Sequence, residues 1–114
     1  MPFINVKTSK ELTSEKIETV KSELGKAISL IPGKSEGWLM VNIEDKSNIY
    51  FKGTDDNNTA YVEVNLFGDA SKDNCEMLTI KICDILDSIA EIPSDRVYVK
   101  YEFCDMWGYN NFMF

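Results

Sequence analysis

Hydrophobic residues recur along this chain in two sets that share one pattern. The first set falls between residues 17 and 31 and the second between residues 75 and 89, each with the spacing of a single buried helical stripe. Every member of the first set has a counterpart 58 positions later (75 − 17 = 58). The sets are Ile17, Val20, Leu24, Ala27, Ile28, Ile31 and Cys75, Leu78, Ile82, Ile85, Leu86, Ile89. The pattern predicts two equivalent helices, and the same offset places Thr13 and Ser71 at their N-caps.

Short apolar segments obey the same offset and predict strands. Residues 3–6 correspond to residues 61–64, and residues 39–42 correspond to residues 97–100. A strand–helix–strand unit is therefore used twice, and connections of this length predict a parallel strand pair in each half with a right-handed crossover. Pro32-Gly33 and Ile92-Pro93 end the two helices. We predict one α+β domain over residues 1–114, with repeats at about residues 2–58 and 59–114.

The predicted strands have two unlike faces. One face is aliphatic and carries Ile4, Val6, Leu39, Val41, Val62, Val64, Val97 and Val99. The other is aromatic and polar and carries Phe3, Asn5, Trp38, Met40, Asn42, Tyr61, Glu63, Asn65, Phe67, Tyr98 and Lys100. Because two helices cannot cover both sides of a four-stranded sheet, we predict both helices on the aliphatic face. We expect the second face to meet other subunits around a partly wet interior; a half-exposed face with scattered aromatic residues is the simpler alternative.

Composition narrows the chemistry that the chain can support. Twelve basic and nineteen acidic residues give a net charge of −7, which argues against nucleic acid as a partner. The chain has no histidine, and its three cysteines form no Cys-x-x-Cys pair, so the common zinc sites, disulfide frameworks and histidine-dependent triads are not expected. No membrane-spanning run or signal peptide is present, so the expected location is the cytoplasm, with export by another route left open.

Two residues are candidates for acid–base chemistry and anion binding. Removal of Met1 would expose the secondary amine of Pro2, and an α-amino group titrates near ~7.7–8.0, low enough to act as a general base near neutral pH. Lys34 lies in the turn after the first helix, at the sheet end where the strand carrying Pro2 begins, and could hold a carboxylate or an enolate. Each residue alone has a simpler explanation: Pro2 as the start of a strand and Lys34 as a cation at a helix C-terminus.

The C-terminal segment is rich in aromatic residues, which is unusual because chain ends generally fray. Phe103, Trp107, Tyr109, Phe112 and Phe114 fall within the last twelve residues. They either wall a pocket or pack onto a neighbouring subunit. The polar run 55–58 is read as a turn between the halves, because it lacks the spacing of a calcium loop.

Taken together, several short motifs resemble the macrophage migration inhibitory factor family of the tautomerase superfamily. They are the Met1-Pro2 start, Gly33-Lys34, Phe51-x-Gly53, Asp95-Arg96-Val97-Tyr98, Gly108-Tyr109-Asn110-Asn111 and the final Phe114. The resemblance covers the whole chain and rests on the order and spacing of these motifs. It implies a homotrimer of β-α-β-β-α-β subunits around a central channel, and keto–enol tautomerisation of phenylpyruvate-like 2-keto acids without a cofactor.

The resemblance also implies roles for individual residues. Pro2 would be the base, and Lys34 would contact the carboxylate or the developing enolate. The backbone N–H of Phe67 would assist, and Tyr98 would reach in from the neighbouring subunit. The remaining substrate-binding positions would be Asn65, Lys100, Trp107, Tyr109 and Phe114.

This chain departs from the family pattern at several of these positions. Lys100 replaces a usual asparagine, Tyr109 a usual tryptophan and Phe67 a usual isoleucine. Residues 59–62 lack the Cys-x-x-Cys of some members, so redox activity is not expected. The leading hypothesis is a tautomerase of aromatic 2-keto acids. The alternative is a cytokine-like ligand of a cell-surface receptor with weak or vestigial turnover.

Overall fold

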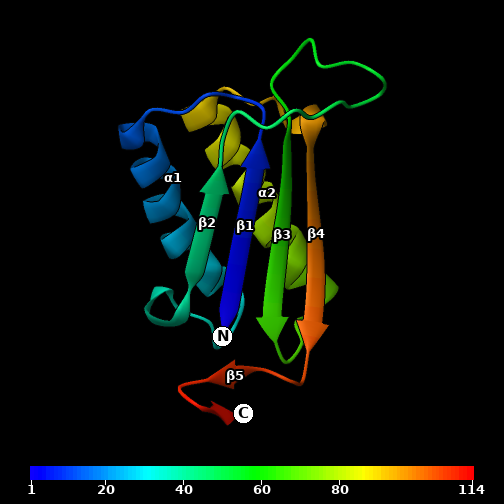
Figure 1. The fold of residues 1–114 in the computed structure, drawn as a ribbon. Coiled ribbons are helices and arrows are strands. Elements are labelled where there is room, and N and C mark those ends of the chain that lie inside the picture. The colour runs from blue at the N-terminus through cyan, green and yellow to red at the C-terminus, as the bar shows by residue number, and fades with distance from the viewer.

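Four strands form one mixed sheet in the computed structural model, which describes all 114 residues. The strands lie in the order β2-β1-β3-β4, with β1 and β2 parallel, β3 and β4 parallel, and β1 and β3 antiparallel (Figure 1). The main elements are β1 (Pro2–Thr8), α1 (Ser14–Ala27), β2 (Met40–Glu44), β3 (Ala60–Phe67), α2 (Lys72–Ala90) and β4 (Val97–Cys104). Short 3₁₀ turns η1 (Ile28–Leu30), η2 (Glu36–Trp38) and η3 (Ser94–Arg96) precede the outer strands, and a small hairpin, β5 (Gly108–Tyr109) with β6 (Phe112–Met113), ends the chain. The predicted pairing of strands within each half is confirmed.

The two helices begin in the same way, as the sequence offset predicts. The side chain of Thr13 accepts a hydrogen bond from the backbone N–H of Lys16, and that of Ser71 accepts one from Asn74, both at 3.1 Å. Each cap satisfies a backbone donor that has no partner inside its helix. The helix ends differ, because α1 gives way to the tighter turn η1 after Ala27, whereas α2 continues for 19 residues.

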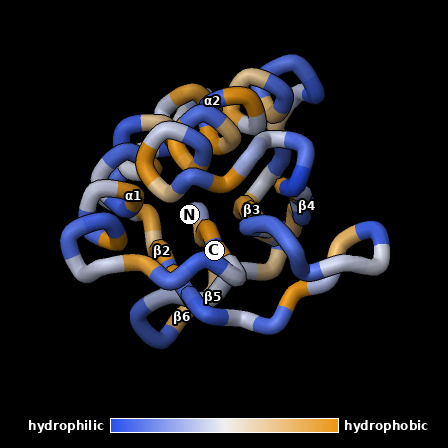
Figure 2. Tube along the Cα trace, turned by 90° about the horizontal axis from the view of Figure 1, so that it is seen from above, coloured by the Kyte–Doolittle hydropathy of each residue, from blue (hydrophilic) through white to orange (hydrophobic).

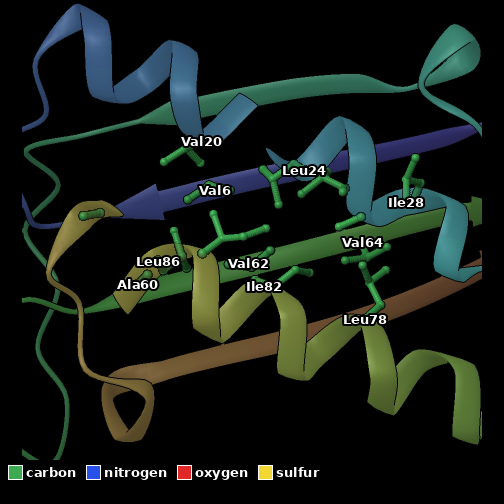
Figure 3. Close-up of a cluster of buried hydrophobic side chains, with 14 of the residues drawn as sticks. Val6, Val20, Leu24, Ile28, Ala60, Val62, Val64, Leu78, Ile82 and Leu86 are labelled. Carbon is green, nitrogen blue, oxygen red and sulfur yellow. The ribbon is translucent and has the colours of Figure 1, made fainter. Parts of the chain in front are cut away.

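The core lies between the helices and the aliphatic face of the sheet. Ile4, Val6, Val62 and Val64 are at most 1% exposed, and Figure 3 shows this face of β1 and β3 meeting the apolar stripes of both helices. The helix side chains at this contact include Val20, Leu24, Ile28, Leu78, Ile82 and Leu86. The prediction that both helices cover one face is therefore confirmed. None of the helices has the length and apolar character needed to cross a membrane.

The opposite face of the sheet is not covered by any element of the chain. Both helices lie on the same side of the sheet when the molecule is viewed along its strands (Figure 2). On the open face, Asn42 donates a hydrogen bond to Asn5 (2.9 Å), which in turn donates to Glu63 (3.2 Å). A ladder of polar side chains therefore crosses three strands on the side that the sequence pattern marks as aromatic and polar.

The predicted position of the second strand is partly wrong. The strand begins at Met40 and runs to Glu44, rather than spanning residues 39–42. Trp38 lies in the turn η2, which closes when the backbone N–H groups of Trp38 and Leu39 donate to the carbonyls of Ser35 and Glu36. Apolar alternation alone cannot distinguish a strand start from a turn of this kind. The turn carries Trp38 away from the open face to the sheet end where β1 begins.

The end of α2 gives a test of local strain. Glu91 adopts a left-handed conformation (φ 58°), which glycine adopts without a steric penalty, and its N–H caps the carbonyl of Asp87. Its carboxylate lies 3.9 Å from Lys10 and 3.7 Å from Lys16, but such exposed pairs stabilise little. We expect Glu91→Gly to raise the free energy of unfolding by about 0.5–1 kcal/mol, measured by urea denaturation at fixed protein concentration. Glu91→Ala is the matched control, because it loses the same carboxylate but keeps the strain. A gain of equal size in both variants would contradict the explanation.

Candidate functional site

A groove of about 510 Å³ opens at the sheet end where β1 begins. Sheet topology assembles it: β1 and β2 are parallel, so both begin at this end, whereas β3 and β4 run the opposite way from β1 and both finish here. The C-terminal segment that follows β4 then passes beneath the start of β1, and the two chain ends lie close together (Figures 1 and 2). The groove is lined by Met1, Pro2, Phe3, Gly37, Trp38, Leu39, Met40, Trp107, Gly108 and Tyr109.

The N-terminal residues are held in a partly desolvated position. Pro2 is buried and pairs with Leu66 at the end of β3. The Met1 carbonyl accepts a hydrogen bond from the backbone N–H of Phe67 at 3.0 Å. Burial, followed by the positive charge and hydrogen bond of Lys34, holds the pKa of the Met1 amine below its ordinary value. An amine at this end of the chain is therefore biased toward its neutral form.

Lys34 reaches the start of β1 from the turn after η1. Gly33 makes this turn with φ +82°, and the N–H of Lys34 donates to the carbonyl of Ile31. The Lys34 ammonium donates to the carbonyl of Phe67 at 2.6 Å, and this contact fixes the charge beside the N-terminal amine. The sequence-based placement of Lys34 at this end of the sheet agrees with the structure. Phe67 thus presents its carbonyl to Lys34 and its N–H to Met1.

Aromatic side chains form one wall of the site. The rings of Trp38 and Tyr109 are perpendicular with centroids 5.3 Å apart, and Phe114 stacks on Tyr109 at 6.2 Å and tilts against Phe67 at 5.9 Å. These are the favoured offset and edge-to-face arrangements of aromatic pairs. Tyr109 belongs to the small hairpin, whose two-residue turn places Asn110 and Asn111 at φ 51° and 72°, as a type I′ turn requires. The backbone N–H of Phe114 donates to the carbonyl of Trp107 and closes the hairpin at its base.

Trp38 is a site residue that the sequence pattern does not predict. The apolar alternation places it on the open face of a strand, whereas the turn η2 places it in the groove against Tyr109. The sequence holds one signal that Trp38 lies in a turn and not in a strand. Trp38 directly follows Gly37 and lies two residues after Glu36, at the end of the Lys34 turn. Tyr109 and Trp107 line the groove, and Phe114 stacks on Tyr109.

Of the other candidate residues, two lie away from the groove of their own chain and one lies beside it. Tyr98 is in register with Tyr61 and Lys7, five residues along β1 from Pro2, or about 16 Å at the usual strand rise. Lys100 pairs with Glu102 at 2.6 Å and is in register with Glu63, nearer the middle of the open face. Asn65 lies on that face opposite Phe3, beside the groove but not among its lining residues.

The remaining titratable groups suggest little further chemistry. Burial raises the pKa of the Cys75 and Cys83 thiols, which disfavours the nucleophilic thiolate. Burial also raises the pKa of Tyr101 to about 12, and its hydroxyl donates to the carbonyl of Cys75 behind the sheet. No group of three or more acidic, cysteine or histidine side chains is arranged to hold a metal ion. The groups that could take part in acid–base chemistry are therefore found together at the start of β1.

The coupling between Lys34 and the terminal amine can be tested in a chain that keeps Met1. Lys34→Met removes a positive charge and a hydrogen bond that both lower the pKa of the amine, so this pKa should rise toward its ordinary value. The measurement is an NMR titration of synthetic protein carrying ¹³C at the Met1 α-carbon. Lys26→Met removes a lysine that pairs with Glu23 on the outside of α1, and should leave the titration unchanged. Equal titration curves for wild type and Lys34→Met would refute the coupling.

Comparison with known proteins agrees with this architecture. The family model described as macrophage migration inhibitory factor (MIF) matches residues 1–110. Leishmania major MIF2 superposes with a TM-score of 0.92 at 29% identity, covering 100% of this chain and 97% of that one. A macrophage migration inhibitory factor homologue from Prochlorococcus marinus gives a TM-score of 0.82 at 24% identity, covering 98% of each chain.

A more distant match is Pt0534, solved after inactivation by 2-oxo-3-pentynoate; it gives a TM-score of 0.79 at 12% identity, covering 90% of this chain and 85% of that one. No curated protein matches the sequence. The family model spans nearly the whole chain, from the start of β1 to the turn of the C-terminal hairpin. The chain therefore belongs to the macrophage migration inhibitory factor family, within the tautomerase superfamily.

Proposed function

We propose that this protein, once Met1 is removed, is a keto–enol tautomerase of phenylpyruvate-like 2-keto acids with the amine of Pro2 as its general base. The observation that carries the proposal is the convergence of three groups at one point: the start of β1, the Lys34 ammonium and the backbone N–H of Phe67. A neutral amine, a cation and a hydrogen-bond donor are the groups that proton transfer next to a carbonyl requires.

Removal of Met1 would change each of these groups in a useful way. The nitrogen of Pro2 would pass from an amide to a secondary amine. The N–H of Phe67 would lose the Met1 carbonyl that it now binds at 3.0 Å, and Lys34 would lose the neighbouring amine. A carboxylate or carbonyl oxygen of a substrate could then take the place of the Met1 carbonyl oxygen, where Phe67 donates and the charge of Lys34 is close.

In the proposed reaction, the neutral nitrogen of Pro2 takes a proton from the carbon next to the ketone. The electron pair of that C–H bond forms a C=C bond, and the ketone oxygen becomes an enolate that Lys34 and the Phe67 N–H stabilise. The protonated amine then delivers its proton to this oxygen, giving the enol; the reverse sequence returns the keto form. Every proton and electron pair is accounted for within the substrate and Pro2, so no cofactor is required.

The aromatic wall favours substrates with an aryl ring. Trp38 and Tyr109 line the groove, where they can pack against a ring while the acid end of the substrate faces Lys34. Lys34 is the one cation that the site contributes near the N-terminus, so a monocarboxylate with an apolar ring suits the groove better than a small diacid.

We further propose that the active form is a homotrimer in which Tyr98 and Lys100 act in the groove of a neighbouring subunit. Both side chains lie on the open face and too far along the sheet to reach their own Pro2. Aromatic surface is exposed at both ends of the sheet: Trp38 at the groove is 53% exposed, and Tyr98 at the other end is 63% exposed. A head-to-tail contact that joins unlike ends of the sheet closes into a ring of three when each subunit is rotated by a third of a turn from the last.

Substitution of Pro2 tests the base. We expect Pro2→Gly to lower kcat/KM for phenylpyruvate by about 10²–10⁴-fold, the usual range for loss of a general base, while the oligomer keeps its size in solution. Intact mass must first show that Met1 is absent from both proteins. A Pro2→Gly protein that retains wild-type turnover would rule out the mechanism. Low turnover in correctly processed wild type, together with saturable binding to cells, would instead favour the receptor-ligand alternative.

Covalent labelling gives a second test of the Pro2 nitrogen. The inactivation of Pt0534 by 2-oxo-3-pentynoate suggests this compound as a probe, because a neutral amine can add to its triple bond and the adjacent carbon takes up the proton. We expect the processed protein to gain the mass of one whole molecule at Pro2, located by peptide mapping, with activity lost in proportion. Excess phenylpyruvate should slow the labelling. The Cys104→Ser variant controls for the one exposed thiol, and labelling that disappears in this variant would contradict the assignment.

A further inference from the structure

We propose that Tyr50 is a further specificity-determining residue, which contacts the aryl ring of a substrate bound in the neighbouring subunit's groove. This inference rests on the trimeric assembly proposed above and adds to it a residue of the long loop between β2 and β3. Neither the sequence motifs nor the groove at Pro2 includes Tyr50.

A second cavity, of about 470 Å³, lies at the opposite end of the open face from Pro2. We call it the far-end cavity; its principal lining residues are Lys7, Ile49, Tyr50, Tyr61 and Tyr98. Three of these five residues are tyrosines, and Lys7 is the only charged residue among all that line the cavity. Lys7, Tyr61 and Tyr98 are in register across β1, β3 and β4, so the floor of the far-end cavity is the open face itself.

The loop that carries Tyr50 is fastened to the sheet. Its first part is tied to β1, because the N–H of Ser47 donates to the carbonyl of Thr8 at 2.9 Å. Phe51, the next residue after Tyr50, meets the ring of Tyr98 edge-to-face with centroids 5.2 Å apart. The guanidinium of Arg96 lies 5.5 Å from the centre of the Phe51 ring and closes this packing from another side.

Arg96 also anchors the far part of the same loop. It donates to the hydroxyl of Thr59 at 2.7 Å and to the carbonyl of Thr54 at 3.1 Å. These bonds hold the backbone on both sides of the loop tip that Figure 1 shows projecting beyond the sheet. The loop that carries Tyr50 is therefore held in place by contacts with the sheet and with Arg96, as the support of a binding residue must be.

Tyr50 has the exposure expected of a residue that completes a site in another subunit. Its side chain is 68% exposed and shares the far-end cavity with Tyr98, which is 63% exposed. Any neighbouring groove that Tyr98 enters must lie against this cavity, and so against Tyr50. At the groove, Trp38 and Tyr109 supply one aromatic wall. Tyr50 would supply the facing wall, in contact with the ring of the substrate but not with its carboxylate.

Tyr50→Ala should therefore weaken ring binding without removing the base. We expect its KM for phenylpyruvate to rise about fivefold to tenfold, the loss of roughly one aromatic contact, with kcat nearly unchanged. Tyr50→Phe keeps the ring and is the matched control, expected to behave as wild type. Enolisation of pyruvate, which has no ring, should be unaffected when followed by deuterium exchange of its methyl group. An unchanged KM for phenylpyruvate in Tyr50→Ala would overturn the inference.

Mixed oligomers show whether Tyr50 acts across subunits. Pro2→Gly and Tyr50→Ala chains are co-expressed with different tags, and oligomers that carry both tags are isolated and assayed at low phenylpyruvate. In a head-to-tail trimer that contains both kinds of chain, about one site in three joins an intact Pro2 to an intact Tyr50. Activity should then exceed the mean of the two parent variants severalfold.

Activity equal to that mean would place Tyr50 in its own chain's site or in folding alone, and would overturn the inference. Failure of the proposed function gives a different result, because Pro2→Gly alone would then retain wild-type activity. Failure of the assembly is also distinct, since no oligomer carrying both tags would be recovered.

Discussion

The site depends on the antiparallel pairing of β1 and β3 between two parallel pairs. Pro2 is in register with Leu66, so the start of β1 and the end of β3 lie at the same end of the sheet. Because β2 is parallel to β1, the Lys34 turn that precedes β2 lies at this end too. Because β4 is parallel to β3, the C-terminal hairpin that follows β4 also starts from this end. A different pairing at the centre of the sheet would separate the amine, the cation and the aromatic wall. The hydrogen bonds of β1 thus hold the sheet together and also bring the amine, the cation and the aromatic wall to one place.

Much of the fold could be predicted because its signals are periodic. The offset of 58 residues identifies both helix caps, and the alternation of apolar residues identifies the buried face of each strand. The start of β2 could not be predicted in this way, since Trp38 and Leu39 continue the apolar run into a turn held by backbone hydrogen bonds. The closing hairpin has a local signal in Asn110-Asn111, two residues that tolerate positive φ, but its docking against Phe67 is a tertiary contact.

The candidate site likewise has features that the sequence can predict and features that depend on tertiary contacts. Pro2 and Lys34 could be placed at one sheet end from connectivity alone, whereas the contact of Lys34 with the Phe67 carbonyl depends on side-chain packing. Tyr98 and Lys100 were selected through resemblance, and in a single chain they lie away from the groove. Their alternation along β4 places them on the open face but cannot show which groove they serve. In a single chain, a residue that serves the site of another copy can be recognised only as an exposed side chain.

Two features of the sheet are hard to reconcile in a single chain, and an assembly explains both. Large aromatic side chains are exposed at both ends of the sheet, Trp38 at one and Tyr98 at the other, yet the centre of the open face is polar, with Asn5, Asn42 and Glu63 joined by hydrogen bonds. A dry interface would leave these polar groups costly to bury, and a fully solvated face would not need the aromatic ends. An assembly that covers the ends and keeps the centre hydrated satisfies both demands. It would also exclude water from the groove, where burial and Lys34 hold the pKa of the Met1 amine below its ordinary value, while leaving the polar ladder in contact with solvent.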